Sequence, residues 1–220
     1  MQARAVLFDL DGTLVNSLPG IEFSVDCALE ECGSPERRQD LRALIGPPIR
    51  NILAKLVPHA GDAELSRLES VFRQSYDSVG WRKSVLYEQA RETLAALKYA
   101  GVPLFLVTNK PAAPTRRILE HVGILDLFTE ILCPDSKDPC FPSKPAMLKE
   151  IVERHSLDSA TCLYVGDTAE DYRAATECGI PIALVAHGYG AESSGNDFPA
   201  GLHLNNLSEL LNLVAVMEMS

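Results

Sequence analysis

The chain has 220 residues, a formal net charge of −10 and a hydrophobic content of 46%. This length and composition suit a globular protein with a substantial hydrophobic core. The acidic charge argues against general binding to nucleic acids or anionic membranes, because both require clustered lysine and arginine.

The first predicted element is a buried strand over residues 5–8, which ends at two carboxylates, Asp9 and Asp11. Two acids at a strand end, followed by Gly12, are costly to bury without a metal or another strong partner. One carboxylate could attack a phosphoryl group and form an aspartyl-phosphate, while the other protonates the leaving oxygen. The alternative is an ordinary strand-to-loop turn, in which Asp and Gly are common.

Residues 18 to about 80 predict helices and contain no strand-like run. The expected helices are Leu18 to Cys32, Gln39 to Ile45, Pro48 to Val57 and Asp62 to Asp77. An insertion of roughly sixty to seventy residues is large enough to form a small domain. We therefore expect a core made of residues 1–16 and 84–220, with residues 17–83 as an inserted helical unit.

The rest of the chain alternates between helices and strands. The expected elements are helix Tyr87 to Tyr99, strand Val102 to Thr108, helix Pro114 to Val122, strand Glu130 to Cys133, helix Pro145 to His155, strand Cys162 to Val165, helix Ala169 to Cys178, strand Ile182 to Val185 and helix Leu207 to Val216. Such alternation predicts an α/β fold with a doubly wound parallel sheet that helices cover on both faces.

Polar residues follow three of the predicted strands. Asp9 ends the first strand, Thr108 and Asn109 end the second, and Asp167 follows Val165. Ligands of open α/β sheets bind outside the carboxyl ends of the strands, so these groups are expected at one crevice. The Thr108 hydroxyl and the donors of Asn109 suit phosphate oxygens, although Thr-Asn before a helix is also ordinary capping chemistry.

Lys144, Asp167 and Asp171 complete the candidate set. Lys144 lies at the start of a predicted helix, where the helix dipole disfavours a cation. This unfavourable position indicates a nearby anion, and the alternative is a solvated lysine. Asp167 and Asp171 lie four residues apart at the start of another helix, where acids also suit the dipole. Together with Asp9 they offer hard oxygen ligands for Mg²⁺.

The six cysteines contain no Cys-x-x-Cys pair and no zinc-like spacing with the five histidines, so we expect buried or reduced thiols. The N-terminus lacks a basic segment followed by an apolar signal region, and no apolar stretch approaches a membrane span. We therefore expect a cytoplasmic protein without membrane contact.

Four motifs now stand in a fixed order: Asp9-Leu10-Asp11-Gly12-Thr13, Thr108-Asn109-Lys110-Pro111, Ser143-Lys144-Pro145 and Gly166-Asp167-x-x-x-Asp171. They resemble the motifs of the haloacid dehalogenase-like hydrolase superfamily, and the likeness covers essentially the whole chain. The helical insertion resembles the α-helical cap of the subgroup that includes phosphoglycolate phosphatase, pyrophosphatases and beta-phosphoglucomutase. The resemblance implies a Rossmann-like core with this cap inserted.

The resemblance also implies roles for the residues. Asp9 would be the nucleophile and Asp11 the general acid and then base, while Thr108 and Lys144 would hold the transferring phosphoryl oxygens. This agrees with the physical view that phosphoryl transfer depends mainly on positioning and charge neutralisation.

The implied cofactor is Mg²⁺, bound by Asp9, the backbone carbonyl of Asp11 and Asp167, with Asp171 supporting from behind. Gly12, Thr13 and Asn109 are further candidates for substrate binding, because they lie within the same motifs.

The segments Val107 to Pro111 and His187 to Gly190 look most like the phosphoglycolate phosphatase branch. Asn16 departs from that branch, where Asp is common, and Ala146 lies in a segment that is often richer in proline. Dehalogenases of the superfamily generally lack the second aspartate of the first motif, so Asp11 argues against that activity. A phosphonatase would need a cap lysine, but Lys55 and Lys83 read as surface residues.

The expected function is therefore that of a Mg²⁺-dependent phosphatase for a small phosphorylated metabolite of the phosphoglycolate type, working as a monomer or a homodimer. The alternatives are an inorganic pyrophosphatase or nucleotidase, a beta-phosphoglucomutase-like phosphotransferase, and a non-catalytic binding relative.

Arg50 follows the turn at residues 46–48. If the family geometry holds, this turn faces the crevice, and the guanidinium could bind a substrate carboxylate or a second phosphate. The alternative is an exposed helix arginine.

Overall fold

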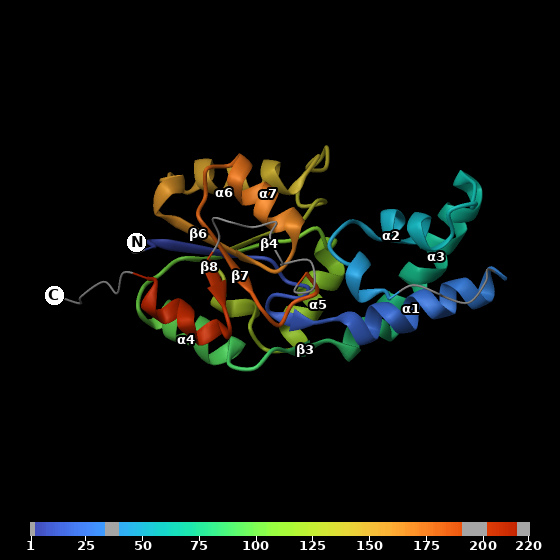
Figure 1. Cartoon of the computed structure of the whole chain (residues 1–220), viewed down its shortest axis with the longest axis horizontal. Helices are drawn as coiled ribbons and strands as arrows, with labels where there is room; N and C mark the ends of the chain where they lie inside the picture. Colours follow the sequence, from blue (N-terminus) through green and yellow to red (C-terminus); the bar gives the residue numbers. More distant parts are fainter. Residues whose placement is uncertain (1–2, 34–39, 191–201, 215–220) are drawn as a thin grey trace.

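A six-stranded parallel sheet forms the centre of the protein, in a computed structural model that describes residues 3–33, 40–190 and 202–214 (Figure 1). The strands are Ala5–Phe8 (β1), Leu104–Val107 (β4), Glu130–Leu132 (β5), Cys162–Gly166 (β6), Ile182–Val185 (β7) and Leu202–Leu204 (β8). Their order is β5-β4-β1-β6-β7-β8, so β1 pairs with both β4 and β6. The predicted α/β fold with a doubly wound parallel sheet is confirmed, and the carboxyl ends of three strands lie side by side.

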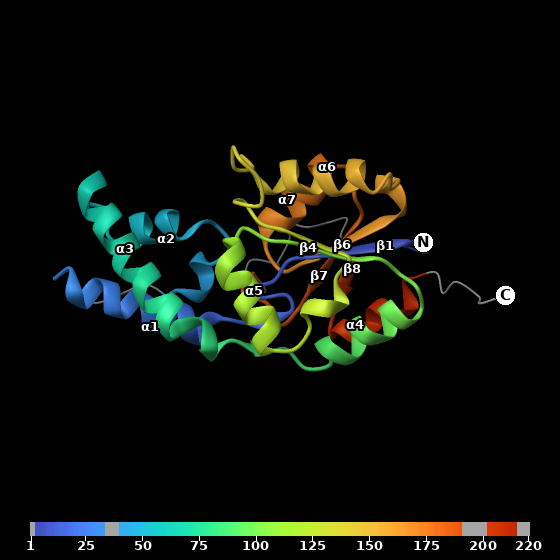
Figure 2. The same ribbon diagram turned by 180° about the vertical axis from the view of Figure 1, so that it is seen from behind.

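Helices cover both faces of this sheet, with α6 and α7 on one face and α4 and α5 on the other (Figures 1 and 2). Their bounds are Ala90–Tyr99 (α4), Ala112–His121 (α5), Lys144–Arg154 (α6) and Ala169–Glu177 (α7). Alternate strand residues point to opposite faces, so Leu7 and Tyr164 belong to one hydrophobic cluster while Phe8 and Val165 belong to the other. The central strands β1 and β6 are therefore apolar on both sides. Within the described residues, no helix combines the length and the apolar composition needed to cross a lipid bilayer.

A helical unit lies beyond the carboxyl edge of the sheet (Figure 1). It contains Leu18–Glu31 (α1), Ile49–Leu56 (α2), Asp62–Ser78 (α3) and the 3-10 helix Gly80–Lys83 (η2), and α1 packs against α3. The chain enters and leaves it through two short antiparallel strands, Val15–Asn16 (β2) and Val85–Leu86 (β3). The domain boundaries expected from the sequence remain a prediction, and this two-stranded ladder lies next to them.

The helix predicted from Gln39 to Ile45 is wrong. Its described part forms only a 3-10 turn, Arg42–Leu44 (η1), and residue 39 lies outside the described ranges. Ile45 is extended with a ψ of 146°, and Gly46 takes a φ of 131°. A helix cannot continue through these dihedral angles, and two prolines follow directly.

Two other helices differ from their predicted bounds by three residues or more, whereas the remaining helices agree within two residues. The last one is a 3-10 helix, Leu207–Asn212 (η6), after which Val214 pairs with Ala3; residues 215 and 216 lie outside the described part of the chain. The helix expected from Tyr87 begins at Ala90, because Gln89 is left-handed with a φ of 61°. The strands β2, β3 and β8 were not predicted, since two or three residues are too few to show a hydrophobic period.

Candidate active site

The candidate site lies where β1, β4 and β6 end. A cavity of about 310 Å³ separates this edge of the sheet from the helical unit, and Asp9, Asp11, Thr108, Asn109 and Lys110 line it from the core side. The polar groups that follow β1 and β4 therefore lie at one crevice, as the sequence predicts. The third strand supplies Asp167, which lies directly beside Asp9.

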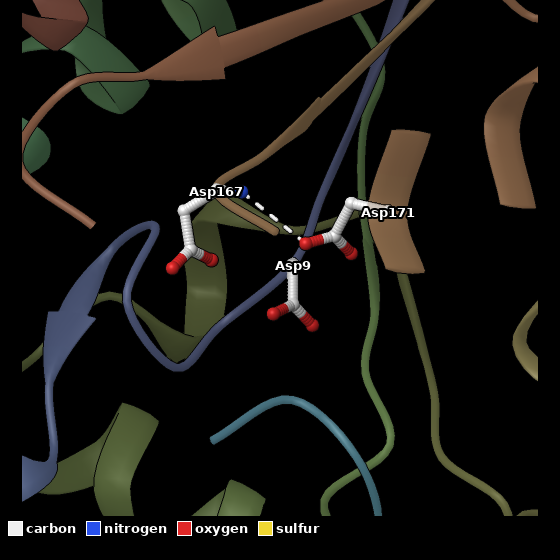
Figure 3. A group of neighbouring side chains, drawn as sticks. All are labelled: Asp9, Asp167 and Asp171. Carbon is white, nitrogen blue, oxygen red and sulfur yellow. Dashed lines mark hydrogen bonds between the residues drawn. The ribbon is translucent and has the colours of Figure 1, made fainter. Parts of the chain in front are cut away.

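Three buried carboxylates, those of Asp9, Asp167 and Asp171, converge at this edge. One oxygen of each lies within 4.8 Å of the others, and Figure 3 shows the side chains gathered from β1 and from the turn that opens α7. Burial, together with the neighbouring charges of Asp171 and Asp9, raises the pKa of Asp167 well above its usual value. Burial likewise raises the pKa of Asp9 to about 7, against the lowering effect of Lys144. The protein therefore concentrates negative charge where it is costly.

Lys144 is the cation buried among these acids. Its ammonium nitrogen lies 2.7 Å from Asp171 Oδ1 and 3.1 Å from Asp9 Oδ1. Burial alone would lower the pKa of Lys144, but the charges of Asp171 and Asp9 outweigh it and raise the pKa well above the usual value. The contact with Asp171 is a hydrogen bond, whereas the geometry toward Asp9 is that of an ion pair without one. Among the described residues, no donor thus forms a well-aligned hydrogen bond to the buried Oδ1 of Asp9.

Asp171 is saturated by donors. Its Oδ2 accepts hydrogen bonds from the backbone N–H groups of Asp167 and Thr168 and from the Thr168 hydroxyl, which also caps α7. Its Oδ1 accepts from Lys144 and from the buried hydroxyl of Tyr164. Burial would raise the pKa of Asp171, but Lys144 and these donors lower it. Asp171 is therefore an ionised anchor for Lys144 and for the turn at Asp167.

The donor set fits a divalent cation. Within the described ranges, one oxygen of Asp9 accepts no well-aligned hydrogen bond. Each oxygen of Asp167 accepts one, from the Thr13 hydroxyl at 3.0 Å and from the Tyr189 N–H at 2.7 Å. Lone pairs thus remain on Asp9 and Asp167, and hard oxygen ligands suit Mg²⁺. The five donors on Asp171 leave it better placed to support the site than to coordinate.

Gly12 and Thr13 both contact the Asp167 carboxylate and help to fix its position. The Thr13 hydroxyl donates to it, while Gly12 has a φ of 85° and a Cβ there would lie 2.2 Å from Asp167 Oδ2. A side chain at residue 12 would therefore displace the carboxylate. Their predicted part in substrate binding remains a prediction.

Thr108 and Asn109 also have defined partners. The alternative that Thr108 caps the following helix is excluded, because α5 begins at Ala112 after Pro111; the Thr108 hydroxyl instead accepts from the Lys110 N–H at 3.2 Å. The Asn109 amide donates to Glu170 at 2.7 Å and to the Gly46 carbonyl of the helical unit at 3.2 Å. Asn109 thus joins the core to the helical unit.

The structure does not bring Arg50 to the cavity. Its guanidinium binds Glu69 at 3.2 Å and also binds Asp62, so it ties α2 to α3. Burial opposes but does not cancel the effect of Glu69, and the pKa of Arg50 is raised. Ile49, the residue before it, lines the cavity instead. Arg50 is therefore a surface residue of the helical unit, as the alternative interpretation had it.

Two groups at the site had no assigned role in the sequence analysis. Lys110 donates to both oxygens of Asp11, at 3.1 and 2.8 Å, and lies 4.8 Å from the centre of the Tyr76 ring. Burial would lower the pKa of Lys110, but Asp11 outweighs it and raises the pKa. In the sequence, only the position of Lys110 directly after Thr108 and Asn109 indicated that it could lie at the site.

The second group is the loop that follows β7. The Tyr189 N–H holds Asp167, and a Cβ at Gly188 would lie 2.1 Å from Asp167 Cβ. Arg42, in the helical unit, donates to the carbonyls of His187 and Gly188. The Gly-x-Gly pattern after a buried strand was the signal for this close approach.

Comparison with known proteins gives an independent view of this arrangement. The chain matches a family model described as "Haloacid dehalogenase-like hydrolase" over residues 6–185. The phosphoglycolate phosphatase of Vibrio vulnificus (strain YJ016) is 31% identical over 230 residues, which cover 98% of this chain and 97% of that protein. The phosphoglycolate phosphatase of Pasteurella multocida (strain Pm70) is 34% identical over 197 residues, or 86% of this chain and 88% of that protein.

Solved structures share the same architecture. The crystal structure of a predicted phosphoglycolate phosphatase from Haemophilus somnus 129PT has a TM-score of 0.84 and 28% sequence identity. It covers 96% of this chain and 98% of its own, so the likeness spans the sheet and the helical unit together.

Proposed function

This chain belongs to the haloacid dehalogenase-like hydrolase family and is a phosphatase, and we propose that it hydrolyses a small phosphomonoester with the help of Mg²⁺, through an aspartyl-phosphate on Asp9. The observation that carries the proposal is the position of Asp9. It is buried at the end of β1 and lines the cavity. Its Oδ1 lies 3.1 Å from the Lys144 ammonium nitrogen and accepts no well-aligned hydrogen bond from the described residues. Phosphoglycolate is the reference compound for the substrate tests, because the curated relatives described above are named phosphoglycolate phosphatase.

Asp9 and Asp167 would hold the metal ion, with the backbone carbonyl of Asp11 as the third protein ligand expected from the family. The ion would supply positive charge that offsets the repulsion between an ionised Asp9 and an anionic substrate. Asp171 would act from behind by fixing Lys144 and the Asp167 turn, since its own oxygens are filled.

In the first step an oxygen of Asp9 attacks phosphorus, and the bond from phosphorus to the leaving alcohol breaks. Asp11 gives its proton to the departing oxygen, so that a neutral alcohol leaves. Thr108 lines the cavity beside Asp9, and the Lys144 ammonium nitrogen lies 3.1 Å from Asp9 Oδ1, so both groups would hold the phosphoryl oxygens. The phosphoryl group then rests on Asp9.

In the second step water attacks that phosphorus, gives its proton to Asp11 and releases phosphate, which restores the Asp9 carboxylate. Lys110 donates hydrogen bonds to both oxygens of Asp11, and a carboxylate held in this way can accept the proton from water. The sum of the steps is one water consumed, with one alcohol and one phosphate released.

The experiment is phosphate release from a panel of phosphomonoesters and from pyrophosphate, measured with Mg²⁺ and with chelator. We expect release that needs Mg²⁺ in the wild type, and a loss of at least about a thousandfold in Asp9→Asn. Two phosphates from pyrophosphate at a higher kcat/KM than any ester would instead identify a pyrophosphatase. Release that chelator leaves unchanged would contradict the proposed role of Mg²⁺.

A further inference from the structure

The cavity above Asp9 is larger than a phosphoryl group requires. Its volume is about 310 Å³, and it extends from the core residues Asp9 and Asp11 to the side chains of α2 and α3. An engineered apolar cavity of about 150 Å³ holds a benzene molecule. The space therefore accommodates a phosphoryl group together with a leaving group of ring size.

The helical unit gives this cavity an apolar wall. Ile45, Ile49, Ile52 and Phe72 all line it, and Ile21 from α1 adds to the same side. Ile45, Ile52 and Phe72 are buried in the hydrophobic cluster that extends from one face of the sheet into the helical unit, so their positions are fixed by packing. A leaving group that projects away from Asp9 would meet hydrocarbon.

The charged groups of the wall offer no unpaired cation among the described residues. Lys110 donates to both oxygens of Asp11, and Arg73 donates to Glu69 at 2.7 Å. Two further acids, Asp77 and Asp135, also line the cavity. A second anionic group on the substrate would therefore face carboxylates without a free cation, which is a costly arrangement.

Tyr76 adds a neutral polar group. It lines the cavity from α3, and its buried hydroxyl interacts with Lys110 and Ser84 but forms no well-aligned hydrogen bond with any described residue. A phenol that keeps its proton can donate to a neutral oxygen. Burial raises the pKa of Tyr76, which preserves that proton.

On the basis of the proposed phosphatase activity, we propose that the preferred substrate is a phosphomonoester of a neutral, mainly apolar alcohol larger than the two-carbon acid of phosphoglycolate. Apolar surface on the leaving group gains free energy when the isoleucine and Phe72 side chains cover it. A carboxylate in the same place loses its hydration without gaining a cation. The leaving-group half of the cavity thus selects against a second negative charge.

Three alkyl phosphates of similar intrinsic reactivity test this. Phosphoglycolate and isobutyl phosphate have nearly the same shape, but the first carries a carboxylate where the second carries two methyl groups. Cyclohexylmethyl phosphate fills more of the cavity. We expect kcat/KM to be at least about tenfold higher for isobutyl phosphate than for phosphoglycolate, and highest for cyclohexylmethyl phosphate.

A matched pair of variants locates the effect. Ile49→Lys places a cation in the cavity wall, and we expect it to raise kcat/KM for phosphoglycolate relative to cyclohexylmethyl phosphate by at least about tenfold. Asn51→Lys adds the same charge at an exposed position of the same helix and should leave the ratio within about twofold of wild type. Thermal unfolding of both variants verifies that they fold.

A wild-type kcat/KM that is higher for phosphoglycolate than for isobutyl phosphate would overturn the leaving-group proposal while leaving the phosphatase intact. An unchanged ratio in Ile49→Lys would overturn the assignment to this wall. An absence of phosphate release from every ester, p-nitrophenyl phosphate included, would overturn the proposed function itself and this inference with it.

Discussion

Lys110 donates hydrogen bonds to both carboxylate oxygens of Asp11, at 3.1 Å to Oδ1 and 2.8 Å to Oδ2. Both side chains are largely buried, with 9% of Lys110 and 16% of Asp11 exposed. Tyr76 from α3 covers the ammonium group with its ring. The proposed proton carrier is therefore held by a core lysine that the helical unit in turn covers, so Lys110 is a positioning residue for Asp11.

Replacing Lys110 tests that role. Lys110→Met keeps the length of the side chain but removes the hydrogen bonds to Asp11, so proton transfer should lose alignment. We expect kcat to fall by about 10- to 100-fold while KM stays within about threefold, because general acid–base catalysis contributes on the order of a hundredfold or more. Steady-state kinetics on one phosphomonoester gives both values.

The control is Lys137→Met, which removes a partly exposed ion pair with Glu150, and neither of these residues lines the cavity. It should leave both constants unchanged. A rise in KM with an unchanged kcat in Lys110→Met would contradict the positioning role and would assign Lys110 to substrate binding instead.

The buried ion pair of Lys144 and Asp171 should dominate local stability. Lys144→Met leaves two buried acids without their cation, and we expect it to lower the free energy of unfolding by about 3 kcal/mol or more. Lys149→Met removes a pair of the same type on the same helix, where Lys149 and Glu177 are 51% and 59% exposed. That control should change stability by less than about 1 kcal/mol.

Urea unfolding at pH 7 measures both values. Equal, small losses in Lys144→Met and Lys149→Met would show that the acids at Asp9 and Asp171 do not depend on Lys144 for their burial.

Much of the fold follows from sequence because the signals are strong. The apolar runs at Ala5–Phe8 and Leu104–Val107 are buried on both faces, so the hydrophobic pattern marks them as strands of a covered parallel sheet. The predictions are wrong or missing where an element is too short to show a hydrophobic period. Arg42–Leu44 forms only a 3-10 turn because the backbone becomes extended at Ile45. The strands β2 and β3 exist only because they pair with each other at the base of the helical unit.

Gly188 controls the position of Asp167. A Cβ there would lie 2.1 Å from Asp167 Cβ, so Gly188→Ala must push the carboxylate or the loop aside. We expect the Mg²⁺ concentration for half-maximal activity to rise by about 10- to 100-fold, as is typical when groups that orient metal ligands are lost.

Gly61→Ala is the matched control, because a Cβ at Gly61 would meet nothing within 4 Å. A Mg²⁺ titration of phosphate release compares the two variants. The same half-maximal concentration in both would contradict the assignment of Asp167 to the metal.

The cysteines should differ in reactivity according to burial. Cys140 is exposed, whereas burial raises the thiol pKa values of Cys133 and Cys162 to about 11. At pH 8 only about one in a thousand of those thiols would be thiolate, the reactive form. Iodoacetamide followed by peptide mass spectrometry should therefore label Cys140 well before the other two.

Urea should abolish the difference between these sites, because unfolding removes the burial. Labelling of Cys133 or Cys162 at the rate of Cys140 in the native protein would contradict the buried positions.

The site shows what a single sequence can and cannot supply. The acids Asp9 and Asp167 could be expected at one edge because parallel strands carry their ends together. The Tyr189 N–H that holds Asp167 could not, because it depends on a loop whose path is fixed only after folding. The same limit misplaced Arg50, whose partners Asp62 and Glu69 lie on another helix.

The central claim is that Asp9 becomes phosphorylated during turnover. Acid quenching of the enzyme during hydrolysis with Mg²⁺, followed by mass spectrometry of the peptide that contains Asp9, detects an acyl-phosphate directly. We expect the mass of one phosphoryl group on that peptide in the wild type and none in Asp9→Asn. Rapid hydrolysis without a phosphorylated Asp9 peptide, or the same label in Asp9→Asn, would contradict the mechanism.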